Sequence, residues 1–469
     1  MGKITSFLKY NIILQPLIMI VGLLGSIVAL RYGGNDYYAE IVTFYTSYSL
    51  LIFIFSLGSS PTIIRFLKND ICTNTKYNTL VFIILLQLLF GGIIFSILYT
   101  ISSSYGNSWV AKFEPETIDL MIILIPVAVL GAVGRSYLNS TLENKIYLSC
   151  ELIKGLLSNI FIVIGSLLRL EVSEIIFGIF IIYLVCELPI IFSIRKIVLL
   201  QIPTFEFLNR IEIISFFVSI SFVRVTKICF ELPFVVFVMN ATGNHAQVSF
   251  VSICYRIVNI LQKVIQLPID RLLPTLMSQR STKYDLFRVL SKSYKYYFYS
   301  LPLLYLVFLI SSGYLFKDVY LLEGDLHFFY IILVIATINL LLSPSNVLVQ
   351  MNFKSRYIMA LSIVSLSLIS LSFYYFNSIY GFIIQLFLIR LVVNFISTIM
   401  CYKFLQSLIS KSLFLCLCFS LTIFFSYITY RFSNTISTVV IIVIFLLFLV
   451  KFNGLDCEEK KFLKKVIKL

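Results

Sequence analysis

Charged side chains stand inside several of the long apolar runs of this 469-residue chain. A charge in hydrocarbon costs several kcal/mol unless it faces a cavity or a partner, so each one is a candidate functional residue. The cations at this depth are Lys154, Arg224, Lys227, Arg256, Lys263 and Arg390, and the acids are Glu151, Glu187 and Glu231. A purely structural set of ion pairs would balance, whereas this excess of positive charge favours an anionic ligand.

The spacing of these residues predicts two charged helix faces. Arg224, Lys227 and Glu231 stand at i, i+3 and i+7, and Arg256 and Lys263 are seven residues apart on the next apolar run. Counting residues from the expected helix ends places Arg224 and Arg256 near the middle of the bilayer. Because a guanidinium fork donates paired hydrogen bonds to oxyanions, these two arginines are the leading candidates for binding a phosphate group.

The same residues have structural interpretations that stay open. Lys227 with Glu231, and Glu151 with Lys154, have the spacing of ion pairs within one helix. Lys263 stands near the inner surface, where a long side chain extends to water. Under these interpretations the charges stabilise helices and contact no ligand.

Two further arginines stand where apolar runs end. Arg31 opens the first outward corner, and Arg65 follows the second apolar run. Anchoring at the membrane interface is the favoured interpretation, and contact with a headgroup that enters or leaves is the alternative. The nine cysteines are scattered without C-x-x-C spacing, so we expect no metal site and no cofactor.

The elements that must position these charges are membrane helices. Hydrophobic residues make up 59% of the chain and charged residues only 13%, far from the composition of a soluble domain. Runs of bilayer-spanning length recur from end to end. They predict an all-α polytopic fold with fourteen spans, at residues 11–30, 41–63, 79–101, 120–138, 147–168, 175–194, 213–238, 247–268, 298–316, 327–350, 357–376, 380–402, 412–430 and 433–452.

The distribution of Lys and Arg predicts the orientation of these spans. With both termini in the cytoplasm, the inner segments and adjoining helix ends hold 26 cations, and the outer segments hold five. Positive charge collects in cytoplasmic loops, so the net charge of +15 is mostly a topology signal. We therefore expect no nucleic-acid partner.

An internal duplication is also predicted. Gly34-Asn35 and Gly243-Asn244 lie 209 residues apart, each in a short polar gap between two apolar runs. Span order and the Pro-Thr exits "SSPTIIRF" (59–66) and "LLPTLMSQ" (272–279) correspond at about the same offset. Six spans per half is an even number, so both halves run the same way and would be related by an axis along the membrane normal. We expect one lobe at 1–200, a second at 201–404, and two extra helices with a basic tail at 405–469.

Two stretches carry a family resemblance. "GLLGSIVALRYGGNDYYAEIVTFYTSYSLLIFIFSLGSSPTIIRFL" (22–67) resembles the opening of the Wzx-type polysaccharide (O-antigen or capsule) flippases of the multidrug/oligosaccharidyl-lipid/polysaccharide (MOP) exporter superfamily. "VSFVSICYRIVNILQKVIQLPIDRLLPTLMSQ" (248–279) is similar to the eighth helix of that group and of the lipid II flippases. There an Arg precedes a proline-containing exit, as Arg256 precedes Pro268 and Pro274 here.

This resemblance implies a function. Such a flippase lies in the bacterial cytoplasmic (inner) membrane. It has two six-helix lobes around a central cavity and moves an undecaprenyl-pyrophosphate-linked oligosaccharide by alternating access. The headgroup would bind Arg224, Arg256, Lys227, Lys263 and Arg390, while Glu231, Glu187, Glu151 and Lys154 would serve coupling or ion pairing. A polysaccharide polymerase and a chain-length regulator are possible partners, and proton or sodium coupling stays open.

Rival functions make different demands on the sequence. A drug/cation antiporter of the same superfamily would need a carboxylate in the N-terminal lobe to bind a proton or sodium ion, and span 1 offers only Asn11 and Gln15. A membrane polysaccharide polymerase or ligase would need a large outer loop with catalytic Arg or His, and the longest outer segment is 102–119. We therefore expect a transporter, not an enzyme.

Overall fold

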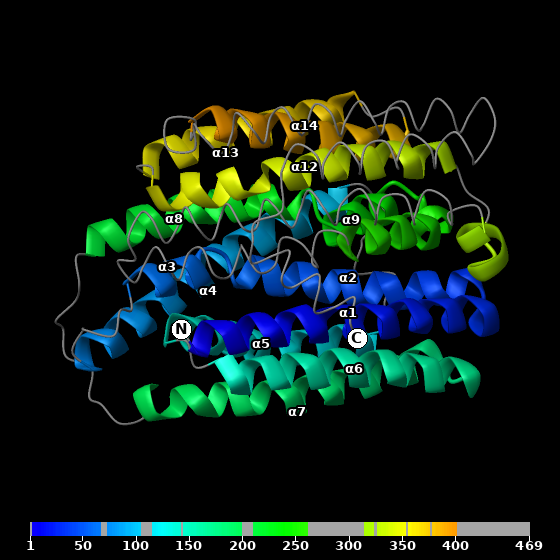
Figure 1. The fold of residues 1–469 in the computed structure, drawn as a ribbon, viewed down its shortest axis with the longest axis horizontal. Helices are drawn as coiled ribbons and strands as arrows, with labels where there is room; N and C mark the ends of the chain where they lie inside the picture. The colour runs from blue at the N-terminus through cyan, green and yellow to red at the C-terminus, as the bar shows by residue number, and fades with distance from the viewer. Residues whose placement is uncertain are drawn as a thin grey trace, which may run out of the picture.

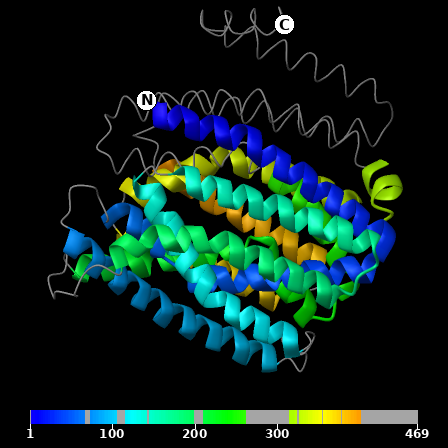
Figure 2. The same ribbon diagram turned by 90° about the horizontal axis from the view of Figure 1, so that it is seen from below.

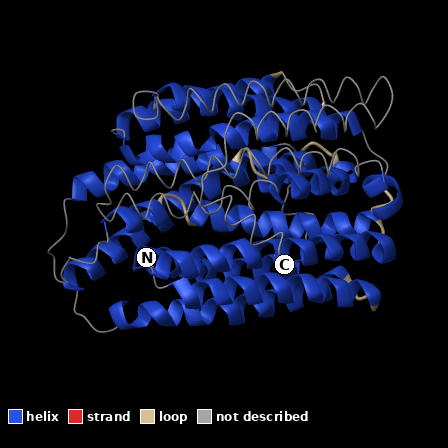
Figure 3. Cartoon of the chain, in the orientation of Figure 1, coloured by secondary structure: helices blue, strands red, loops and turns tan. Residues whose placement is uncertain are grey.

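The computed structural model describes residues 2–66, 73–104, 115–141, 144–198, 210–260, 314–322, 326–352, 355–375 and 378–400. These residues form helices joined by short turns, with no strand among them (Figure 3). Bilayer-spanning segments satisfy their backbone hydrogen bonds internally, and long apolar runs do so as helices. By length and composition, five of the described helices could cross a membrane, or six if one bent pair is a single span.

The first half of the chain contributes seven helices to the described part. They are α1 (Gly2–Gly33), α2 (Asn35–Phe55), α3 (Ser59–Phe66), α4 (Thr73–Ser104), α5 (Pro115–Thr141), α6 (Asn144–Leu167) and α7 (Val172–Val198). In Figure 1 most of them occupy the lower part of the molecule, with α7 at the bottom. Figure 2 shows the same helices running roughly along one another.

The second half contributes helices and two short helical turns. They are α8 (Arg210–Ile228), α9 (Leu232–Ala241), the 3₁₀ turn η2 (His245–Gln247), the π-helical turn η3 (Leu315–Val319), α12 (Leu326–Asn352), α13 (Ser355–Tyr374) and α14 (Ile379–Met400). A helical segment, Val248–Ile260, follows η2. α12, α13 and α14 form the upper layer of Figure 1, with α8 and α9 between them and the first half.

The two halves meet along α2, α3, α8 and α9. α2 packs against α9, and α3 packs against α8. Apolar side chains fill this contact: Val235 of α9 and Leu57, just after α2, are fully buried in one large core. Phe66 of α3 lies edge-on to Phe216 of α8 with ring centroids 5.8 Å apart.

Predicted span 7 is wrong as one continuous helix. α8 ends at Ile228 and α9 begins at Leu232 after a bend of 62°. Pro233 lies in the first turn of α9, where its missing N–H is tolerated. Its ring would clash with the backbone of a helix that continued from residue 229, so it favours a break there. Glu231 is the N-cap of α9, so Arg224, Lys227 and Glu231 do not share the face of a single helix, contrary to the prediction from spacing.

Predicted span 2, at 41–63, falls within one candidate membrane span, Asn35–Ile63. That span contains a short break, because α2 ends at Phe55 and α3 begins at Ser59. Predicted spans 298–316, 412–430 and 433–452 lie wholly or almost wholly outside the described residues, as does the inner part of 247–268. The lobe boundaries, the total of fourteen spans and the rotation between the lobes therefore stay predictions.

The repeated Gly-Asn corner has a structural reason in each half. Gly34 has φ 91° and ψ −179°, and Gly243 has φ 78°. Side chains strongly disfavour these conformations, and glycine adopts them readily. Each glycine therefore turns the chain between two antiparallel helices in a tight corner.

Candidate functional site

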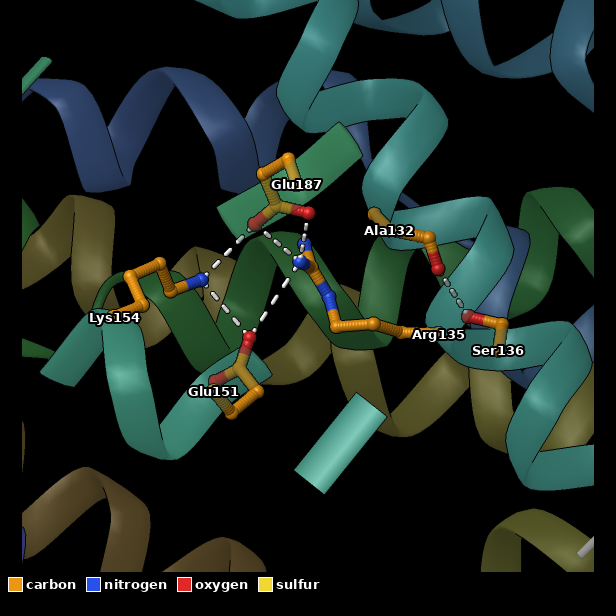
Figure 4. Close-up of polar contacts among 6 residues, drawn as sticks. All are labelled: Ala132, Arg135, Ser136, Glu151, Lys154 and Glu187. Atoms are coloured by element: carbon orange, nitrogen blue, oxygen red, sulfur yellow. Dashed lines mark hydrogen bonds and ion pairs between the residues drawn. The ribbon is translucent and has the colours of Figure 1, made fainter. Parts of the chain in front are cut away.

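Four charged side chains meet inside the first half of the chain (Figure 4). Arg135 of α5 places Nη1 2.5 Å from Oε1 and 2.6 Å from Oε2 of Glu187 on α7. Lys154 of α6 places Nζ 3.0 Å from the same Glu187 carboxylate and 2.9 Å from Oε1 of Glu151. Arg135 also lies 3.5 Å from Glu151. We call Arg135, Glu151, Lys154 and Glu187 the charged tetrad.

Burial and a close backbone approach hold the tetrad together. The Glu187 side chain is 4% exposed, those of Arg135 and Lys154 17%, and that of Glu151 28%. The Glu187 carboxylate lies directly against Gly131 of α5, where a Cβ atom would collide with Oε2. Only a glycine leaves room there for the carboxylate to reach Arg135.

Aromatic rings cover one side of the tetrad. Nζ of Lys154 lies 5.4 Å from the ring centre of Tyr183 on α7. That ring stacks on Tyr48 of α2 at 5.3 Å and lies edge-on to Tyr45 at 6.3 Å. The tetrad is therefore enclosed by α2, α5, α6 and α7 and screened little by water, which strengthens each ion pair.

The tetrad corrects the charge count made from the sequence. Arg135 was not among the deep cations named there. In the structure Arg135 is a buried partner of Glu187. The tetrad contains two cations and two acids, so Glu151 and Glu187 are neutralised within it. The excess positive charge among the described deep residues then lies in the second half.

Arg256 links the two halves of the molecule. It stands in segment 248–260, is half-buried, and donates a hydrogen bond from Nη1 to the backbone carbonyl of Gly22 on α1 over 2.8 Å. Its guanidinium also lies 5.7 Å from the ring centre of Tyr38 on α2. Arg256 therefore crosses from the second half to two helices of the first.

The remaining predicted cations are spread through the second half. Arg224 on α8 and Arg390 on α14 are half-buried, whereas Lys227 near the end of α8 is exposed. Arg390 and Glu231 both interact electrostatically with Tyr255, whose side chain is 2% exposed. These three cations and Arg256 stand on three different helical elements, α8, segment 248–260 and α14, and Lys263 lies outside the described residues.

The two terminal arginines contact protein groups. Arg31, at the end of α1, donates to the carbonyls of Asp318 at 2.7 Å and Val319 at 3.1 Å, across the two halves. Arg65 lies 3.4 Å from Glu212, and its guanidinium is 4.3 Å from the ring centre of Phe216 on α8. These contacts join the halves at two points far from each other in the sequence.

The duplicated corners also touch. The hydroxyl of Ser249 donates to the carbonyl of Asn35 over 2.9 Å, and the Asn35 side chain donates to the carbonyl of Ala246 over 3.4 Å. Asn240 of α9 lies 3.4 Å from Thr43 of α2. The corner of each half therefore closes against the other at the end that the charge distribution places outside.

Several solved structures with a similar arrangement are MATE transporters. A multidrug resistance MATE family transporter of the MOP superfamily, in an inward-facing conformation, matches 81% of this chain and 93% of its own at 14% identity and a TM-score of 0.55. The MATE multidrug transporter DinF-BH matches 86% of this chain and 95% of its own at 11% identity, also with a TM-score of 0.55. The chain has the MATE fold. A mutant of a Vibrio cholerae MATE transporter matches with a TM-score of 0.52 at 12% identity, over 87% of this chain and 99% of its own.

The MATE fold agrees with the all-helical membrane architecture predicted from the sequence. With its apolar helices, it makes the chain a multi-pass membrane protein. No protein-family model and no curated protein sequence matches the chain. At 11–15% identity the solved structures carry the fold alone, so the transported molecule must be inferred from the residues of this chain.

Proposed function

We propose that this chain is an alternating-access flippase that carries an undecaprenyl-pyrophosphate-linked oligosaccharide across the bacterial inner membrane for surface polysaccharide synthesis. The observation that carries the proposal is the charge distribution. The tetrad neutralises its own acids, whereas the described apolar helices of the second half carry Arg256 and Arg390 with one acid, Glu231. An anionic headgroup between the halves would offset that excess of positive charge.

Arg256 is the best placed of these cations for the proposed role. Its guanidinium lies at the contact between the halves, where alternating access would expose it. Guanidinium groups bind phosphate oxygens in a paired geometry that an ammonium group lacks. Arg224 and Arg390 are proposed as further headgroup contacts, with Lys227 and Lys263 contributing positive potential.

A multidrug or cation antiporter is the second candidate, because the matched MATE structures include multidrug transporters. The tetrad bears directly on it. The first apolar run has no acid, but Glu151 and Glu187 stand at membrane depth later in the first half. However, Arg135 and Lys154 already occupy their oxygens at 2.5–3.5 Å. A coupling ion would have to displace a fixed cation from each acid, which disfavours this candidate.

Binding to the purified protein separates the two candidates. We expect a lipid-linked pyrophosphate to bind and inorganic pyrophosphate to compete for it, with affinity that falls as salt rises. A cationic dye should neither compete nor be transported against a proton or sodium gradient in proteoliposomes. Gradient-driven dye transport without pyrophosphate binding would reject the flippase in favour of the antiporter.

A further inference from the structure

Tyr38 has an environment that the fold does not explain. Its side chain is 1% exposed, yet its hydroxyl has no hydrogen-bond partner among the described residues. A buried hydroxyl without a partner is unfavourable and rare in native structures. The ring of Tyr38 lies under the guanidinium of Arg256, 5.7 Å from Cζ to ring centre. An unpaired donor therefore stands next to a cation that comes from the other half.

The bond that holds Arg256 in place depends on the halves being closed at the outer corner. Arg256 donates to the carbonyl of Gly22, which belongs to α1. The Asn35–Ser249 bond closes the corner on the same side of the molecule. Tyr38 stands only three residues after Asn35, roughly 5 Å along α2. If the corners part, the guanidinium loses its carbonyl acceptor, and both donors become accessible together.

We propose that Tyr38 and Arg256 form an oxyanion site in the outer half of the membrane, which binds the pyrophosphate headgroup when the outer corners open. The inference rests on the proposed function. It adds Tyr38 as a headgroup contact and assigns that contact to the outward-open state. The phenol hydroxyl donates one hydrogen bond to a phosphate oxygen, and the guanidinium donates a pair. In the closed state the Gly22 carbonyl takes the place of the anion on Arg256.

This site gives the substrate an effect on the transport cycle. A ligand shifts a conformational equilibrium only through different affinities for the two states. Pyrophosphate would bind the Tyr38–Arg256 site only in the outward-open state, because in the closed state the Tyr38 hydroxyl is buried. Headgroup binding therefore favours opening to the outside, where the lipid-linked oligosaccharide is released.

Thiol labelling of the outer seam tests the proposal. Thr43 is 3% exposed and contacts Asn240 of the other half, so a Thr43→Cys variant in a Cys-depleted background reports opening. In nanodiscs, inorganic pyrophosphate should accelerate its reaction with an impermeant thiol reagent, and equal concentrations of sulfate should not. The added Tyr38→Phe change should require about tenfold more pyrophosphate for the same acceleration.

Tyr37→Phe is the matched control, because the Tyr37 hydroxyl donates to the carbonyl of Leu170 within the first half. It should leave the pyrophosphate dependence unchanged. Tyr38→Phe should also keep or raise the unfolding temperature, since it removes an unpaired hydroxyl. An unchanged pyrophosphate dependence in Tyr38→Phe would overturn the proposed site alone. Absence of any pyrophosphate binding or effect in the parent protein would overturn the proposed function as well.

Discussion

Arg135 and Glu187, 52 residues apart in the chain, form a buried ion pair in which Nη1 of Arg135 lies 2.5 Å from a carboxylate that is 4% exposed. Removal of one partner from such a pair leaves an uncompensated charge in a nonaqueous environment. Lys154 and Glu151 complete the balance. The pairing indicates that these four residues stabilise the first half. The contacts given for Arg256 are different in kind, because they are a backbone carbonyl and an aromatic ring and not a carboxylate.

Removal of one member of the tetrad should therefore lower stability. We expect Arg135→Met and Glu187→Gln each to destabilise the folded protein by about 3–5 kcal/mol, because each leaves a buried charge unpaired. Unfolding temperature in detergent and the yield of monodisperse protein measure the effect. The double variant should recover part of the loss, and Lys317→Met, which changes an exposed cation, should have no effect. Single variants as stable as the parent would refute the structural role.

A second prediction concerns Gly131, which packs against the tetrad. Gly131→Ala would place a Cβ against the Glu187 carboxylate and force it away from Arg135. We expect a loss of unfolding temperature comparable to that of Glu187→Gln, and little further loss when both changes are combined. Additive losses in the double variant would show that Gly131 acts independently of the tetrad.

Much of the fold could be predicted from the sequence, because apolar run length and the placement of cations depend on local composition. The breaks at residues 56–58 and 229–231 were missed, although Gly58, which has φ 69°, was the available signal for the first break. Pro233 was the available signal for the second break. The pairing of Arg135 with Glu187 and the contact of Arg256 with Gly22 depend on how distant helices pack, which residue spacing does not encode.

The corner glycines make a third prediction. Gly34 has φ 91° and ψ −179°, a conformation found almost only in glycine, so Gly34→Ala should cost about 1–3 kcal/mol of folding stability. Gly92→Ala is the control, because Gly92 lies within α4 and a Cβ there meets open space. That change should be neutral or stabilise the helix by up to about 1 kcal/mol. Equal stability of the two variants would argue against a strained corner.

The orientation of the chain can be tested by labelling. Single cysteines at position 35 or 244 of a Cys-depleted variant should react with an impermeant thiol reagent in intact cells, since both corners are expected outside. Position 283, in the predicted cytoplasmic segment with the most Lys and Arg in the middle of the chain, should react only after permeabilisation. Labelling of position 283 in intact cells would reverse the topology.

The central claim is that Arg224 and Arg256 bind the lipid-linked pyrophosphate. The direct measurement is surface polysaccharide in the native strain with its chromosomal copy replaced by Arg224→Gln or Arg256→Gln, normalised to membrane-inserted protein. We predict normal protein levels with surface glycan abolished in both, and partial recovery with Lys, which keeps the charge but loses the fork. Normal glycan export from both Gln variants would contradict the claim, and loss of protein in place of export would show that these arginines compensate buried acids.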